Sequence, residues 1–372
     1  KTDLSSGTKF CAPTHHISTN KVTESVFHRT HLFLFTFAGI KVYMDKYKIL
    51  LTGGAGFIGS NIAESLVTHP EVDKVVVLDN LSTGFEENIS GLLKHPKFSF
   101  WKGDIRDDKT CIEASRGMNV VCHQAALGSV PRSIQNPQTT NEVNINGTLN
   151  VFHAAKENNI TKVVFASSSS VYGDNSSLSK KEEVIGNPLS PYSVTKQAGE
   201  LYAKAFSKSY NFNFIGLRYF NVFGPNQSPE GPYAAVIPLF ILNTMQNKPS
   251  VINGDGSQSR DFTYITNVVQ ANIHAILSDR SASWNTIYNI AFGGCTTLLE
   301  LFGMIQQVAG KQIKPSFGPW RHGDMLHSLA DITKARNYLS YHPQLSLSEG
   351  LKLTYDWFSK KRCYSSATAP PL

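Results

Sequence analysis

The stretch LTGGAGFIG at residues 51–59 decides the fold. It follows a short apolar run, residues 49–52, and opens a segment with helical apolar spacing, residues 57–68. Its three spaced glycines permit a tight turn, a close approach of the backbone to a pyrophosphate, and close packing of the helix on the strand. The free N–H groups at the start of the helix favour phosphate. The stretch therefore predicts a dinucleotide-binding strand–turn–helix.

An acidic residue follows where a dinucleotide site needs one. Asp79 ends the second apolar run, about 20 residues after Gly59. A carboxylate there accepts hydrogen bonds from ribose hydroxyls and repels a 2′-phosphate. The pattern predicts NAD rather than NADP. The alternative is a glycine turn with a capping acid and no ligand.

Outward from this unit, short apolar runs alternate with helical segments up to Asn221. The runs begin at Ile49, Val75, Phe98, Val120, Val163 and Phe214, and the helical patterns cover 57–68, 139–158 and 190–209. Continuously apolar strands are typical of a parallel sheet covered on both faces. The alternation predicts an α/β fold with a Rossmann-type doubly wound parallel sheet. Later helical patterns at 234–246, 267–277 and 298–308, between loops rich in Pro and Gly, predict a smaller C-terminal α/β substrate-binding domain.

The chain divides into four parts on this interpretation. Residues 44–220 form the NAD-binding domain, and residues 221–360 form a second domain interleaved with the first. Residues 1–43 are an extension outside the fold, because the apolar stretch within them is too short to span a bilayer and Met44 directly precedes the fold signal. Residues 361–372 are a tail, and we expect it to be disordered from Cys363 onward.

Composition excludes several classes of function. The 372 residues are 41% hydrophobic and 17% charged, as in an ordinary folded protein. The net charge of +7 is scattered, without the basic and aromatic block that a nucleic-acid groove needs. The five cysteines are odd in number and lack CxxC spacing, so neither a disulfide framework nor a metal site is expected. We expect reduced thiols in a cytoplasmic protein with no membrane or nucleic-acid partner.

A tyrosine and a lysine supply the candidate chemistry. Tyr192 and Lys196 are four residues apart in the predicted helix 190–209 and therefore share one face. A phenol with a pKa near 10 is a poor base, but a nearby ammonium and an oxidised nicotinamide both lower that pKa. The segment ASSSSVYG at 166–173 ends a strand at the sheet edge where ligands bind. The alternatives are a surface Tyr–Lys pair and a serine-rich turn.

Together these motifs resemble the extended short-chain dehydrogenase/reductase family, which includes NAD-dependent epimerases and dehydratases. The similarity runs from about residue 47 to 358 and also includes GDIR at 103–106, HQAA at 123–126, NINGT at 144–148 and LRYFNVFG at 217–224. The segment ALGSVPRSI at 126–134 is most similar to bacterial UDP-N-acetylglucosamine 4-epimerases.

The resemblance implies three sets of site residues. The catalytic set is Ser168, Tyr192 and Lys196. The NAD set is Gly53, Gly56, Phe57, Ile58, Gly59, Asp79, Asn80, Ser82, Thr83, Gly84, Asp104, Ile105, Gln124, Ala125, Ala126, Asn144, Ser167, Tyr192, Lys196 and Tyr219. The substrate set is Gly128, Ser129, Val130, Arg132, Ser168, Ser169, Asn221, Ala235, Val236, Ile237, Asn253, Gln258, Arg260, Arg321, Asp324 and Ser328.

The implied reaction is 4-epimerisation of a UDP-N-acetylhexosamine, from UDP-GlcNAc to UDP-GalNAc, through a 4-keto sugar with NAD tightly bound and recycled. Ser169 and Ser170 stand where dehydratases and decarboxylases of the family carry acidic residues, which disfavours those reactions. Ser328 stands where epimerases restricted to glucose and galactose carry a tyrosine. Its small side chain leaves volume for an N-acetyl group.

Other functions remain open at this point. Arg132 suits a carboxylate, so UDP-N-acetylglucosaminuronate is an alternative substrate, as is UDP-glucose. A UDP-glucuronate decarboxylase or a 4,6-dehydratase is less favoured. A non-enzymatic NAD-sensing regulator commonly lacks the Tyr–Lys pair that this chain retains. The resemblance also implies a homodimer through the helices at 139–158 and 190–209.

Overall fold

A seven-stranded parallel sheet organises the residues that the computed structural model describes, 46–230, 234–320 and 326–367. Its strand order is β12-β7-β5-β4-β1-β2-β3. The strands are β1 Tyr47–Thr52, β2 Val72–Asp79, β3 Phe98–Lys102, β4 Val120–His123, β5 Lys162–Ser168, β7 Asn213–Tyr219 and β12 Thr286–Ile290. From β1 the chain adds strands first on one side and then on the other, which opens a crevice at the carboxyl ends of β1 and β4. The predicted doubly wound sheet is confirmed.

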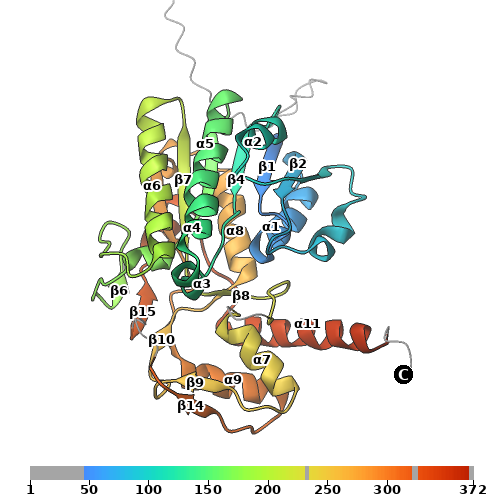
Figure 1. Cartoon of the computed structure of the whole chain (residues 1–372), viewed down its shortest axis with the longest axis vertical. Coiled ribbons are helices and arrows are strands. Elements are labelled where there is room, and N and C mark those ends of the chain that lie inside the picture. Colours follow the sequence, from blue (N-terminus) through green and yellow to red (C-terminus); the bar gives the residue numbers. More distant parts are fainter. Residues whose placement is uncertain (1–45, 231–233, 321–325, 368–372) are drawn as a thin grey trace, which may run out of the picture. The chain divides into compact units, whose positions relative to one another are not determined.

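Helices cover both faces of this sheet, as Figure 1 shows. Along β1, Ile49 and Leu51 belong to one buried cluster and Leu50 to the other, because successive side chains point to opposite faces. The first face is covered by α1 Phe57–Thr68 and α8 Ile265–Ile276. The second face is covered by α2 Asp108–Ala114, α5 Gly147–Glu157 and α6 Pro191–Ser209.

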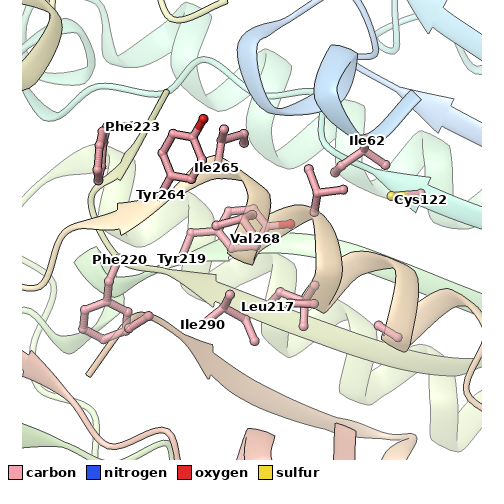
Figure 2. Packing of buried hydrophobic residues seen from close by; sticks show 14 of the residues in the cluster. Ile62, Cys122, Leu217, Tyr219, Phe220, Phe223, Tyr264, Ile265, Val268 and Ile290 are labelled. Carbon is pink, nitrogen blue, oxygen red and sulfur yellow. The ribbon is translucent and has the colours of Figure 1, made fainter. Parts of the chain in front are cut away.

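The core on the first face is continuous from the sheet into the C-terminal part of the chain. Figure 2 shows Val268 of α8 in the same cluster as Ile62 of α1 and Leu217 of β7. Phe223 and Tyr264 extend that cluster, and their ring centroids are 5.6 Å apart. The same cluster contains Ile237, a predicted substrate residue of the C-terminal part, so this part shares one core with the sheet that carries the cofactor loop.

The predicted helix 139–158 consists of three pieces. It comprises α4 Pro137–Asn141, a π turn η2 Glu142–Asn146, and α5. A short helix, α3 Val130–Gln135, precedes it, and the Ser129 side chain caps α3 by accepting a hydrogen bond from the Arg132 backbone N–H. The break matters for the site because the π turn contains Asn144.

The remaining strands are short. One sheet has the order β13-β10-β15-β6, and two further pairs are β11-β8 and β14-β9. Their bounds are β6 Ser179–Lys180, β8 Val222–Phe223, β9 Val251–Asn253, β10 Ser259–Arg260, β11 Thr263–Tyr264, β13 Thr296–Thr297, β14 Ser316–Gly318 and β15 His327–Ala330. The 3-10 turns are η1 Glu86–Leu92, η3 Ser169–Tyr172 and η4 Ser281–Ser283.

The C-terminal helices are α7 Val236–Met245, α9 Leu298–Ala309, α10 Thr333–Leu339 and α11 Leu347–Ala367. The helices expected at 234–246, 267–277 and 298–308 are confirmed within a few residues as α7, α8 and α9. The disorder expected from Cys363 is wrong as far as Ala367, because α11 continues to that residue. The extension 1–43 lies outside the described residues, and the boundary at 220/221 stays a prediction.

The described part of the chain contains neither a membrane-spanning helix nor a cluster of metal ligands. No helix in it is both long enough and apolar enough to cross a bilayer. No group of three or more His, Cys, Asp or Glu side chains among the same residues is arranged to hold a metal ion.

Candidate active site

Two glycines at the turn between β1 and α1, Gly53 and Gly59, have no room for a side chain. Gly53 has a φ of +71°, and a Cβ atom placed on it would lie 2.6 Å from the Ala125 backbone nitrogen. A Cβ atom on Gly59 would lie 2.1 Å from the Gly53 carbonyl oxygen. Since α1 begins at Phe57, its free backbone N–H groups face this turn. The loop therefore fits a pyrophosphate group.

Asp79 lies at the end of β2 and holds this loop. One carboxylate oxygen accepts a hydrogen bond from the Ala55 backbone N–H at 2.9 Å, and the other accepts one from the Leu81 N–H at 2.8 Å. Next to it, Asn80 donates to the Asp104 carboxylate at 2.8 Å. The hydrogen bond from Arg106 lowers the pKa of Asp104 to about 2. Asp79 and Asp104 therefore line this edge of the site with carboxylate oxygens, which suit the hydroxyl groups of a ribose.

A cavity of about 330 Å³ runs along this crevice. It is lined by all but two of the predicted NAD residues: Gly53, Gly56, Phe57, Ile58, Gly59, Asp79, Asn80, Ser82, Thr83, Asp104, Ile105, Gln124, Ala125, Ala126, Ser167, Tyr192, Lys196 and Tyr219. Of the two exceptions, Gly84 packs against the loop, where a Cβ atom would lie 2.7 Å from the Ala55 carbonyl carbon. Asn144 is buried behind the lining, where it contacts the Leu127 backbone.

The lining also includes residues that sequence reasoning missed. They are Leu78, Gly103, Leu127, Val143 and Ala166. Gly103 and Ala166 lie inside quoted motifs, so the motif boundaries were a usable signal for them. Leu78 and Val143 carry no chemical signal, because an apolar lining residue looks like any core residue.

A second cavity of about 420 Å³ adjoins the first. Five predicted substrate residues line it: Gly128, Arg132, Ser168, Asn221 and Ala235. Its other lining residues after β7 were missed: Val222, Gln227, Ser228, Glu230 and Ala234. Both cavities share one wall, formed by Phe57, Ile58, Gly128, Ser167, Tyr192 and Tyr219.

The other predicted substrate residues lie outside both cavities or outside the described residues. Outside both cavities are Ser129, Val130, Ser169, Val236, Ile237, Asn253, Gln258, Arg260 and Ser328. Gln258 is buried and donates to the Asn253 carbonyl oxygen at 2.6 Å. Ser328 is buried on β15 opposite Arg260 of β10. Arg321 and Asp324 fall in 321–325, outside the described residues.

Tyr192 and Lys196 lie together on the first turns of α6, as the spacing predicted. The Lys196 ammonium lies 5.9 Å from the centroid of the Tyr192 ring and donates to the Ala166 carbonyl oxygen at 2.9 Å. Burial lowers the pKa of Lys196 to about 8. Burial also raises the pKa of Tyr192, and a side-chain hydrogen bond with Ser168 opposes that rise. Tyr192 therefore needs a further positive charge beside it to act as a base.

His123, at the carboxyl end of β4, is buried between two hydroxyl groups. Its Nδ1 is 2.7 Å from the Thr52 hydroxyl and its Nε2 is 2.9 Å from the Thr148 hydroxyl. Burial and the nearby Lys196 lower the pKa of His123 to about 3. The ring is therefore neutral and acts as a structural link between β1, β4 and α5.

The arrangement has counterparts among known proteins. The profile of the NAD-dependent epimerase/dehydratase family matches residues 49–291. The structure of a UDP-N-acetylglucosamine 4-epimerase from Methanobrevibacter ruminantium, in complex with UDP-N-acetylmuramic acid, is similar with a TM-score of 0.80 and 40% identity, covering 86% of this chain and 100% of that one.

Two other relatives are named for different sugar substrates. A UDP-glucose 4-epimerase from Mycolicibacterium smegmatis is 36% identical over 84% of this chain and 99% of its own length. The structure of a UDP-glucuronic acid 4-epimerase from Bacillus cereus, with UDP-glucuronic acid and NAD, has a TM-score of 0.79 and 32% identity, covering 84% of this chain and 99% of that one.

Proposed function

The chain belongs to the NAD-dependent epimerase/dehydratase family, and from this premise we propose that it is a UDP-sugar 4-epimerase that interconverts UDP-GlcNAc and UDP-GalNAc. One observation carries the proposal. Tyr192 lies on the wall shared by a cavity that fits NAD and a second cavity of about 420 Å³ beside it. A single phenol can thus reach a sugar hydroxyl while it faces the cofactor.

The residues of the first cavity fit NAD. The glycine loop supplies a turn that a Cβ atom would block, α1 supplies backbone N–H groups for the pyrophosphate, and Asp79 supplies acceptors for the ribose. Bound NAD supplies reversible oxidation of the sugar at C4, and it is regenerated in each cycle.

The chain's own groups handle the proton. Tyr192 takes the proton of the sugar O4. It returns that proton after the 4-keto sugar has rotated in the second cavity and presents its opposite face to the cofactor. Ser168 forms a hydrogen bond with Tyr192 and lines the same cavity, which suits it to hold O4. Lys196 supplies a positive charge close to the phenol, which favours the phenolate.

The surroundings of Ser168 argue against elimination of water. The two residues after it, Ser169 and Ser170, are serines in the η3 turn. Among the described residues that line the second cavity, Glu230 is the single carboxylate, and it is exposed. A 4,6-dehydratase needs an acid and a base at C5 and C6. The second cavity therefore suits epimerisation better.

The sugar is proposed from two supports. The relative from Methanobrevibacter ruminantium is named for UDP-N-acetylglucosamine, and Gly128 gives the second cavity an open wall, since nothing lies within 4 Å of a Cβ atom on it. Ser328 stays a predicted contributor through its small size. Arg132 favours a second candidate, an N-acetylated sugar with a carboxylate, because it lines the same cavity.

The test is incubation of the purified protein, without added NAD, with UDP-GlcNAc, UDP-glucose and UDP-N-acetylglucosaminuronate, followed by anion-exchange analysis. We expect UDP-GalNAc, and a loss of about 10²- to 10⁴-fold in kcat for Tyr192→Phe. Conversion of the uronate alone, abolished by Arg132→Met, would transfer the assignment to the second candidate. Absence of any conversion by protein that retains NAD would overturn the epimerase proposal and favour a regulator.

We also infer that the protein is a homodimer through α5 and α6. On α6, the side chains of Val194 and Leu201 are 46% and 65% exposed. Apolar side chains of this size on one helix suit a helix-on-helix contact between two copies.

A further inference from the structure

A buried carboxylate lies behind the wall that the two cavities share. Glu200 of α6 is 3% exposed. One of its oxygens accepts a hydrogen bond from the Ser167 hydroxyl at 2.5 Å and one from the Arg218 Nε at 2.8 Å. Its other oxygen accepts from the Arg218 Nη2 at 2.8 Å. The proposed reaction assigns no role to this carboxylate.

The contact between Glu200 and Ser167 is the middle one of three contacts that join the end of β5 to α6. The Ala166 carbonyl accepts a hydrogen bond from Lys196, the Ser167 hydroxyl donates to Glu200, and the Ser168 side chain bonds Tyr192. Three successive residues at the end of β5 are thus matched to three residues of α6 that lie on one helical face. A shift of β5 along α6 would break all three contacts together.

Arg218 anchors the carboxylate on the side away from the cavities. It is 2% exposed on β7, and its Nη1 donates to the Tyr172 hydroxyl and to the Glu182 carbonyl, both at 3.0 Å. The paired guanidinium and carboxylate are fixed in a planar, two-bond geometry. Arg218 therefore holds Glu200 in place on one side, and Ser167 connects it to the wall of the cavities on the other.

We propose that Glu200 is a positioning residue, which fixes the register between Ser168 and Tyr192 through Ser167 and places a negative charge one helical turn from Lys196. The inference rests on the proposed epimerase function. Its effect on the reaction passes through Ser167 and Lys196, since Glu200 itself lines neither cavity.

The charge also bears on the state of Lys196. Burial lowers the pKa of Lys196 to about 8, and the negative charge of Glu200 opposes that change. The other titratable groups that face Lys196 are Tyr192 on α6 and the neutral His123 on β4. Removing the charge of Glu200 leaves the Arg218 cation unpaired, and both changes disfavour the ammonium.

Two variants of the full-length, NAD-bound protein separate the two parts of the role. Glu200→Gln removes the charge, whereas Ser167→Ala removes the contact and keeps the ion pair, so its fold is retained. We expect both to lower kcat by about ten- to a hundredfold at little cost in KM, as misplaced reacting groups do. Only Glu200→Gln should move the basic limb of the pH profile to lower pH. Glu113→Gln, on the exposed surface of α2 and outside the inferred dimer interface, is the control.

A merely structural role gives a different result. It predicts a lower melting temperature for Glu200→Gln with an unmoved basic limb, and an unchanged kcat for Ser167→Ala. Either finding would overturn the inference.

A second measurement needs no substrate. The protein is labelled with ¹³Cε-lysine, and the Lys196 signal is assigned by its loss in Lys196→Arg. We expect that signal to titrate at lower pH in Glu200→Gln, and an unchanged midpoint would refute the inference. This result is independent of the sugar, so it distinguishes a failure here from a failure of the proposed function.

Discussion

At the scale of single residues, Gly59 offers the sharpest test of the phosphate loop. Its replacement by alanine puts a Cβ atom 2.1 Å from the Gly53 carbonyl oxygen. We expect Gly59→Ala to lose bound NAD and about 1–3 kcal/mol of unfolding free energy through overpacking. The amount of NAD released on denaturation measures the bound cofactor, and the melting temperature reports the loss of stability. Gly91→Ala, with nothing within 4 Å of its Cβ atom, is the control and should keep its NAD. Full NAD content in Gly59→Ala would exclude this loop as the cradle.

Lys196 leads to a prediction on pH. Its pKa is lowered to about 8 by burial, so the ammonium loses its proton as the pH rises through about 8. Because the ammonium favours the Tyr192 phenolate, we expect kcat to fall above that pH. In Lys196→Arg the guanidinium stays charged, so its remaining activity should show no such fall. A wild-type profile that is flat to pH 10 would contradict this role.

Sequence reasoning found residues whose chemistry is local. The glycines, Asp79, Tyr192 and Lys196 belong to motifs whose spacing alone puts them at one sheet edge, and all of them line the first cavity. Glu200 was missed, because its role depends on contacts of α6 with Ser167 on β5 and Arg218 on β7. No spacing rule in one sequence encodes a contact of this kind.

At the scale of elements, the π turn η2 between α4 and α5 controls a cavity wall. It holds Asn144, whose side chain accepts from the Leu127 N–H at 2.8 Å and donates to the Leu127 carbonyl at 3.2 Å and to Thr195 at 3.1 Å. We expect Asn144→Ala to lose about 1–3 kcal/mol of unfolding free energy, because it leaves buried backbone groups unpaired. Chemical denaturation measures this.

The same replacement should raise the KM for the sugar nucleotide, since Leu127 precedes Gly128, which lines the second cavity. Asn146→Ala changes an exposed asparagine of the same turn and should do neither. If Asn144→Ala and Asn146→Ala changed the stability and the KM equally, the hydrogen bonds of Asn144 to Leu127 would have no special role.

The elements themselves were predictable where the apolar pattern is strong. The six strands β1 to β5 and β7 were predicted, because each contains an apolar run. The two-residue strand β6 was not predicted. The strand β12 was missed, because the sequence TIYNI is short, is interrupted by a polar residue, Asn289, and lies within a region of loops. Its Asn289 is buried and accepts a hydrogen bond from the Tyr172 hydroxyl at 2.6 Å, and a polar residue in the sequence gives no sign of such a buried contact.

At the scale of the whole molecule, the exposed face of α6 predicts the oligomeric state. We expect a dimer in solution that Leu201→Glu converts to a monomer, because the new carboxylate would be buried without a partner. Light scattering after size exclusion measures the mass. Leu93→Glu alters a similarly apolar, 45% exposed residue after η1 and should leave the dimer intact. A monomeric wild-type protein, or a dimeric Leu201→Glu, would contradict the α6 interface.

The position of β12 also bears on biosynthesis. On the ribosome, residues 47–219 emerge before β12 and contain six of the seven strands. The edge of β7 stays open until residues 286–290 follow, and β6 waits for residues 329–330. For that interval the nascent chain exposes an unpaired β-edge, a template for association between neighbouring chains. The stretch of translation between β7 and β12 is therefore when this protein most needs a chaperone.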